Sequence, residues 1–188
     1  MDSVLFFNLA HTLASDAGII AGFLHPILGY DHLLAMLAVG LLSAQIGGRA
    51  IWTVPTAFVV MMVIGGMIGF FGGGLPFIEE GIAGSVILLG GVLLFQQRER
   101  LLPEMIALII VGVFAIFHGY AHGAEVPVEK TAIFFLAYVF GFVVATAGLH
   151  IIGALIGYIA MRSDRGSLIL RGSGLLIAAI GVYFFLSI

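Results

Sequence analysis

The chain has 188 residues, of which 62% are hydrophobic and 9% are charged, and its formal net charge is −3. Its mean hydropathy of +1.23 excludes an ordinary soluble globular domain and indicates a polytopic membrane protein. The sequence contains no cysteine, which excludes disulfides, a thiolate metal site and a cysteine nucleophile.

The apolar runs predict an all-α bundle with six membrane-spanning helices in a single domain over residues 1–188, since a span needs about 20 apolar residues. Residues 1–24 mix apolar and polar groups, and we expect them to form an N-terminal segment outside the membrane. The helices are expected at 25–46, 51–71, 77–97, 103–124, 130–161 and 167–187. Pro26 and Pro103 fall where the first turn of a helix tolerates proline.

Basic residues gather in the connections after the first, third and fifth expected helices, at Arg49, Arg98, Arg100, Arg162 and Arg165. The opposite side is acidic, and Lys130 is its only basic residue. The positive-inside rule therefore predicts that both termini lie on the non-cytoplasmic side. Because the N-terminus lacks a basic signal-peptide start, we expect a mature form whose signal peptide has been removed.

The stretch from His25 to Met36 carries two imidazoles and a carboxylate in an otherwise apolar run. On one continuous helix, His25 and His32 are nearly two turns apart and would share a face, with Asp31 beside them. Ionisable groups are costly in a bilayer, so their presence there indicates a functional site.

A second polar stretch runs from His118 to Glu125. His118 and His122 are four residues apart and Glu125 follows three later, so all three should project from one side of a helix. In the predicted topology both stretches lie in the outer half of the membrane. Imidazole and carboxylate together suit nickel, cobalt, zinc or iron(II), so the sequence predicts a shared divalent-metal site. The alternative is that each histidine makes an interhelical hydrogen bond.

Three further residues have two interpretations each. His150, toward the inner side, is either a second station on an exit path or a packing histidine. His11 either attracts cations at the entrance or is an ordinary exposed polar residue. Met36 is either a soft ligand below His32 or a core filler.

Several function classes are excluded by missing features. The sequence has no phosphate-binding G-x-x-x-x-G-K-[ST] motif and no basic surface for nucleic acid. Our first hypothesis is a transporter, without enzymatic activity or a prosthetic group. The route would be either channel-like or that of a secondary carrier, with the membrane potential driving a metal-ion substrate inward. The enzyme alternative is an intramembrane metal-dependent hydrolase, which would open sideways to lipid rather than toward the cytoplasm. A third alternative is a membrane subunit with a purely structural metal.

The two polar stretches resemble the two signatures of the HupE/UreJ family of nickel permeases. The resemblance rests on His25-Pro26, Gly29, Asp31-His32-Leu33-Leu34-Ala35-Met36, Ala38-Val39-Gly40, Phe117-His118-Gly119, Ala121-His122-Gly123 and Glu125. It implies that the metal is handled by His25, Asp31, His32, His118, His122 and Glu125. It also implies uptake of nickel, or of cobalt, across a bacterial inner membrane, with a functional link to hydrogenase or urease maturation proteins. The oligomeric state stays open.

Overall fold

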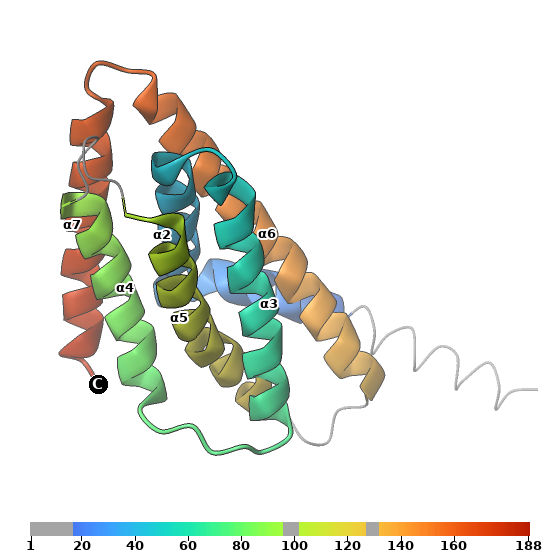
Figure 1. Ribbon diagram of the computed structural model, residues 1–188. Coiled ribbons are helices and arrows are strands. Elements are labelled where there is room, and N and C mark those ends of the chain that lie inside the picture. The colour runs from blue at the N-terminus through green and yellow to red at the C-terminus, as the bar shows by residue number, and fades with distance from the viewer. Residues whose placement is uncertain (1–16, 96–101, 127–131) are drawn as a thin grey trace, which may run out of the picture.

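The computed structural model describes residues 17–95, 102–126 and 132–188, and every regular element within these ranges is a helix (Figure 1). The labelled helices are α2 Tyr30–Ile46, α3 Ala50–Phe70, α4 Ile78–Phe95, α5 Glu104–Glu125, α6 Ala132–Met161 and α7 Gly166–Phe185. A further helix, Ala17–Leu28, precedes α2 and is called the N-terminal helix below. Each of α3 to α7 is long and apolar enough to span a membrane, and the N-terminal helix with α2 forms a sixth candidate. The predicted all-α multi-span class is confirmed.

Helices α3 to α7 begin and end close to the ranges expected from the apolar runs. The expected first helix at 25–46 is wrong, because two helices meet there at Gly29 with a bend of 78°. Pro26 accordingly lies two residues before the end of the N-terminal helix and not in a first turn. Proline removes a backbone donor and weakens the helix around it, which fits a helix that ends at Leu28. His11 lies outside the described residues.

Glycines set the closest helix contacts. A Cβ atom on Gly119 of α5 would lie 1.9 Å from the Met62 carbonyl oxygen of α3, and one on Gly123 would lie 1.9 Å from the Gly66 carbonyl oxygen. Only glycine allows two backbones to approach so closely, and small residues are the usual means of helix packing in lipid. Each of these glycines follows a histidine of the second polar stretch, so the contact fixes where His118 and His122 lie.

The N-terminal helix packs on α6 in the same way. A Cβ on Gly22 would lie 2.0 Å from the Tyr138 carbonyl oxygen, and one on Gly141 of α6 would lie 2.1 Å from the Ile19 carbonyl oxygen. Residues 17–24, which we expected in a segment ahead of the first helix, are therefore part of the packed bundle. Their contact with α6 positions His25.

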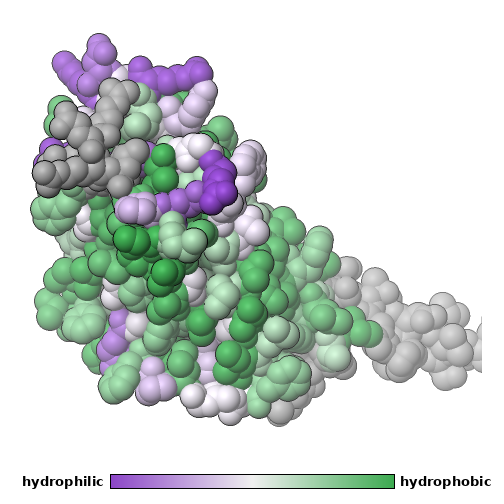
Figure 2. Space-filling model, in the orientation of Figure 1, coloured by the Kyte–Doolittle hydropathy of each residue, from purple (hydrophilic) through white to green (hydrophobic). Residues whose placement is uncertain are grey.

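One end of the bundle carries several arginines. The turns after α2 and α6 lie at one end of the bundle (Figure 1), and they carry Arg49, Arg162 and Arg165. At this end Arg49 Nε donates to Glu104 Oε2 at 2.8 Å, which ties the start of α3 to the start of α5. Figure 2 shows hydrophilic residues gathered at this end and hydrophobic residues over the middle of the bundle.

Candidate metal site

Four histidine rings from three helices meet at the end of the bundle opposite Arg49. His25 comes from the N-terminal helix, His32 from α2, and His118 and His122 from α5. The ring centroids of His32 and His122 are 4.3 Å apart, those of His32 and His118 4.8 Å, and those of His25 and His122 4.5 Å. We call these four residues the histidine cluster.

The bend at Gly29 is what brings the two histidines of the first stretch together. The expectation that His25 and His32 share one face of a continuous helix is wrong, because the axis turns by 78° between them. Their ring centroids nevertheless lie 6.1 Å apart. A Cβ on Gly29 would lie 3.2 Å from His32 Nδ1 and 3.3 Å from Asp31 Oδ1, so a side chain here would crowd the site.

Several imidazole nitrogens of the cluster are buried and have no hydrogen-bond partner among the described residues. They are Nε2 of His32, Nδ1 of His118 and both ring nitrogens of His122. An unsatisfied buried polar atom costs about 1 to 3 kcal/mol, and such atoms in a native structure point to a water or ion that completes them. A neutral imidazole nitrogen is a good ligand for divalent transition metals, so the donor set fits a metal ion.

Asp31 lies behind His32. Its Oδ1 is 2.8 Å from His32 Nδ1 and also accepts the backbone N–H of His32 at 2.8 Å. When Nδ1–H donates to the carboxylate, Nε2 keeps its lone pair, and Nε2 is the atom left without a partner. This is the carboxylate–histidine arrangement that orients metal ligands in many sites. The geometry therefore favours an orienting role for Asp31, whereas its direct ligation stays a prediction.

Ser85 of α4 orients His118 as Asp31 orients His32, and the sequence interpretation missed it. Its hydroxyl donates to the Ile82 carbonyl oxygen at 2.6 Å and lies 2.8 Å from His118 Nε2. Because a hydroxyl has one proton, both hydrogen bonds can exist together only if Nε2–H of His118 is the donor to Ser85. The lone pair of His118 is then on Nδ1. A single serine in an apolar helix gives no sequence signal for this contact.

The cluster reaches the surface at Glu125. Glu125 Oε2 lies 3.3 Å from His25 Nε2, and ligand atoms of His25, His122 and Glu125 all lie within 4.8 Å of one another. Beside Asp31, a vestibule of about 580 Å³ opens between the start of α2, the start of α4 and the C-terminus. Asp31 and Glu79 are among the residues that line it, so two acids lie at a cavity next to the cluster residue His32.

The structure thus brings together all six residues predicted to handle the metal. It does not bring in His150, whose ring neighbour is Phe58 at 5.1 Å between centroids. Phe58 also lies 5.8 Å from the His118 ring, so it is a neighbour of both histidines. Met36 is fully buried in the apolar core, in agreement with the core-filler interpretation.

Comparison with known proteins places nearly the whole described bundle in one family. A family model described as HupE / UreJ protein matches residues 3–184. The chain is 40% identical over 173 residues to Protein HupE of Rhizobium leguminosarum bv. viciae, an alignment that covers 92% of this chain and 86% of that protein. No solved structure matches significantly. On the family model and this relative together, the chain belongs to the HupE/UreJ family.

Proposed function

We propose that this membrane protein is a permease that admits divalent nickel, with cobalt as the closest competing ion, through the histidine cluster. The observation that carries the proposal is the convergence of four imidazoles among helices apolar enough to span a membrane. Several of their buried nitrogens have no partner within residues 17–95, 102–126 and 132–188. Neutral imidazoles suit nickel and cobalt. Membership of the HupE/UreJ family supports the same role, and with it a supply of nickel to hydrogenase or urease maturation.

The charge at the ends of the bundle supports an inward direction. The arginine-rich end should face the cytoplasm by the positive-inside rule, which leaves both termini and the histidine cluster on the outer side of a bacterial inner membrane. Along α5, His118 lies fourteen residues after Glu104, which is about 21 Å from the arginine-rich end. The cluster is therefore far from the end that should face the cytoplasm. An inside-negative potential favours entry by about 2.3 kcal/mol per charge per 100 mV, hence by about 4.6 kcal/mol for a divalent ion.

Each group of side chains in and beside the cluster has its own step in the proposed entry of the ion. Glu79 and Asp31 line the vestibule and raise the local concentration of cations, because clefts lined by one sign of charge attract the opposite sign. Glu125 and His25 hold the exposed edge. His32, His118 and His122 then replace water around the ion. Conduction requires binding that is easily reversed, and the cluster's neutral imidazoles supply no full negative charge that would trap the ion.

The hydrolase alternative gains no specific observation. Hydrolysis would need room for a substrate beside the metal and a positioned general base. The cavity next to His122, between α3, α5 and α6, is only about 20 Å³, which is room for about one water. The cavity of about 580 Å³ beside Asp31 is larger, but its described lining includes none of the four histidines.

The test is uptake of radioactive nickel into proteoliposomes that hold the purified protein, with and without an inside-negative potential. We expect saturable entry that increases with the potential and that is absent from a His32→Ala/His118→Ala variant. Competition by cobalt and zinc then ranks the ions. Nickel binding without entry would contradict the permease proposal.

A further inference from the structure

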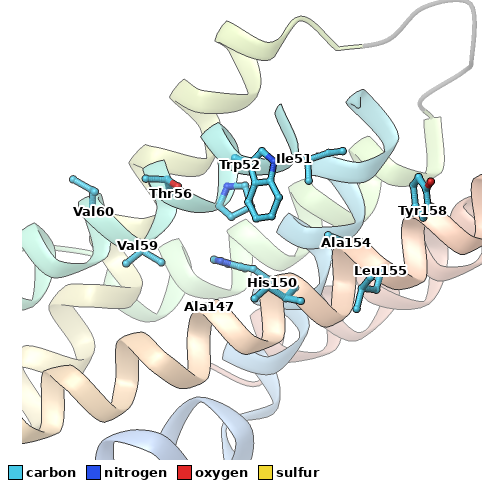
Figure 3. Close-up of a pocket in the computed structure, with 12 residues that line it drawn as sticks. Ile51, Trp52, Thr56, Val59, Val60, Ala147, His150, Ala154, Leu155 and Tyr158 are labelled. Carbon is cyan, nitrogen blue, oxygen red and sulfur yellow. The ribbon is translucent and has the colours of Figure 1, made fainter. Parts of the chain in front are cut away.

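A groove of about 470 Å³ lies on the side of the bundle between α3 and α6, in the half that carries the arginine-rich end (Figure 3). Nearly all of its lining is aliphatic or aromatic. The ionisable exception is His150, which is 2% exposed and packs edge-on against Phe58 at 5.1 Å between ring centroids. His150 therefore adds almost no polar surface, and an occupant of the groove must itself be apolar.

The groove exists because α6 packs closely on α2, and not on α3, at this depth. A Cβ on Gly153 of α6 would lie 2.4 Å from the Leu37 carbonyl oxygen of α2, so the glycine face of α6 holds this helix against α2. On the side toward α3, α6 carries Ala147 and Ala154, which are seven residues apart and share one face. Their small side chains leave a space that neither helix fills.

The groove opens sideways to the surroundings of the bundle. Trp52 and Val60 of α3 and Ile151 and Leu155 of α6 line it, and all four are more than half exposed. Both helices are long and apolar enough to span a membrane, and apolar side chains exposed on such helices face lipid. Acyl chains are therefore the apolar material that surrounds the opening of the groove.

The length of the groove matches the depth of one leaflet. Ala147 and Tyr158, which lie toward opposite ends of it (Figure 3), are eleven residues apart on α6, or about 16 Å. Half of the hydrocarbon core of a bilayer is about 15 Å. Trp52 is in the first turn of α3 and Tyr158 in the last turn of α6, and these residue types settle at membrane interfaces. A chain anchored there would run along the groove toward the middle of the membrane.

A guanidinium group lies at the interfacial end of the groove. Arg162 Nη2 donates to the Tyr158 hydroxyl, and the guanidinium carbon lies 4.5 Å from the centre of the Tyr158 ring. Within residues 17–95, 102–126 and 132–188 no carboxylate forms an ion pair with Arg162, whereas Arg49 at the same end is paired with Glu104. The other N–H groups of Arg162 suit a phosphate, which guanidinium binds through two parallel hydrogen bonds.

We propose that this groove binds one acyl chain of an anionic phospholipid from the leaflet at the arginine-rich end, with the lipid headgroup at Arg162. Lipid tails are as apolar as the groove lining, so the chain alone gives no preference between lipids. The preference comes from the headgroup, because basic residues at the cytoplasmic surface attract anionic lipids. The bound chain fills the space between α3 and α6. This inference goes beyond the proposed function and does not depend on metal transport.

The first test uses Trp52, the only tryptophan of the chain, as a fluorescent reporter in the groove wall. The protein is reconstituted in phosphatidylcholine vesicles that contain either phosphatidylglycerol or phosphatidylcholine with brominated acyl chains, which quench tryptophan on contact. One arginine near a membrane surface corresponds to about a fivefold preference for an anionic lipid. We therefore expect brominated phosphatidylglycerol to occupy the site about fivefold better than brominated phosphatidylcholine.

Arg162→Gln should lower this preference to about one, because the headgroup loses its cationic partner. The matched control is Arg165→Gln, which removes a second guanidinium from the same turn but leaves the contact of Arg162 with Tyr158 intact. This variant should keep most of the preference. Equal quenching by the two lipids in the wild type would overturn the inference. Equal effects of the two arginine variants would also overturn it, since general surface charge would then explain the preference.

The second test closes the groove. Ala147→Phe adds a ring inside it, and Val144→Phe adds the same ring on the exposed face of α6 outside it. Native mass spectrometry with added phosphatidylglycerol should show one retained lipid for the wild type and Val144→Phe, and none for Ala147→Phe. Arg162→Gln, which changes an exposed side chain, should also lose the lipid and decides the matter if Ala147→Phe does not fold.

Equal lipid retention by folded Ala147→Phe and the wild type would overturn the inference. A dimer in which Trp52 is shielded from both brominated lipids would overturn it too, because a second copy of the chain would then cover the groove.

Discussion

Replacing Ser85 with alanine should weaken nickel binding although Ser85 itself is not expected to touch the metal. Ser85 accepts Nε2–H of His118 at 2.8 Å while donating to the Ile82 carbonyl at 2.6 Å. In Ser85→Ala that buried N–H loses its acceptor. His118 can then move its proton to Nδ1 or rotate, and either change removes the lone pair from the metal position.

The size of the effect follows from the known cost of such partners. Loss of a hydrogen bond that orients a ligand lowers metal affinity by about 10- to 100-fold, which is about 1.4 to 2.8 kcal/mol of binding free energy. We therefore expect the nickel dissociation constant of Ser85→Ala to rise within this range. The fold should survive, because Ser85 is replaced by a smaller and good helix-forming residue.

The assay is calorimetric titration of detergent-solubilised protein with nickel, with Ser43→Ala as the matched control. Ser43 is also buried, and its hydroxyl also donates to a carbonyl three residues earlier, that of Gly40 at 2.7 Å. No imidazole depends on it. Equal affinities for Ser85→Ala, Ser43→Ala and wild type would refute the orienting role of Ser85.

Three further predictions concern the cluster and its packing. Asp31→Asn should abolish nickel uptake with folding retained, and wild-type uptake in this variant would remove Asp31 from the mechanism. Glu125→Gln should raise the nickel concentration for half-maximal uptake and leave the maximal rate within about twofold, since Glu125 lies at the exposed edge; a lost maximal rate would show a deeper role. Gly123→Ala should cost about 1 to 3 kcal/mol or more by forcing α3 and α5 apart, seen as a lower melting temperature with weaker nickel binding. Its control is Gly148→Ala, where a Cβ meets nothing within 4 Å, and equal melting temperatures for the two variants would contradict the packing argument.

Much of the fold could be predicted from hydropathy because lipid demands long apolar helices. The apolar runs place α3 to α7 well. They do not reveal the bend at Gly29, because hydropathy carries no information on the direction of a helix and the bend depends on how the N-terminal helix packs on α6. The pairing of His25 with His32 was therefore expected for a wrong reason, although the two rings do meet.

The residues of the candidate site could be predicted where their type alone is unusual in an apolar helix. They could not be predicted where their role depends on how the helices pack. Histidines and acids in apolar helices can be recognised from the sequence, because ionisable groups are costly in a bilayer and therefore indicate a functional site. The role of Ser85 depends on which face of α4 meets α5, and the separation of His150 from the cluster depends on how α6 packs against the other helices. Neither could be read from spacing along one helix.

The most direct measurement is anomalous diffraction at the nickel absorption edge from crystals grown with nickel. We predict one strong peak within the histidine cluster, in contact with His122 and with at least two of His25, His32, His118 and Glu125; ligand atoms of His25, His122 and Glu125 already lie within 4.8 Å of one another. A nickel ion held only by carboxylates and water, or bound away from the histidine cluster, would contradict the assignment of this cluster as the metal site.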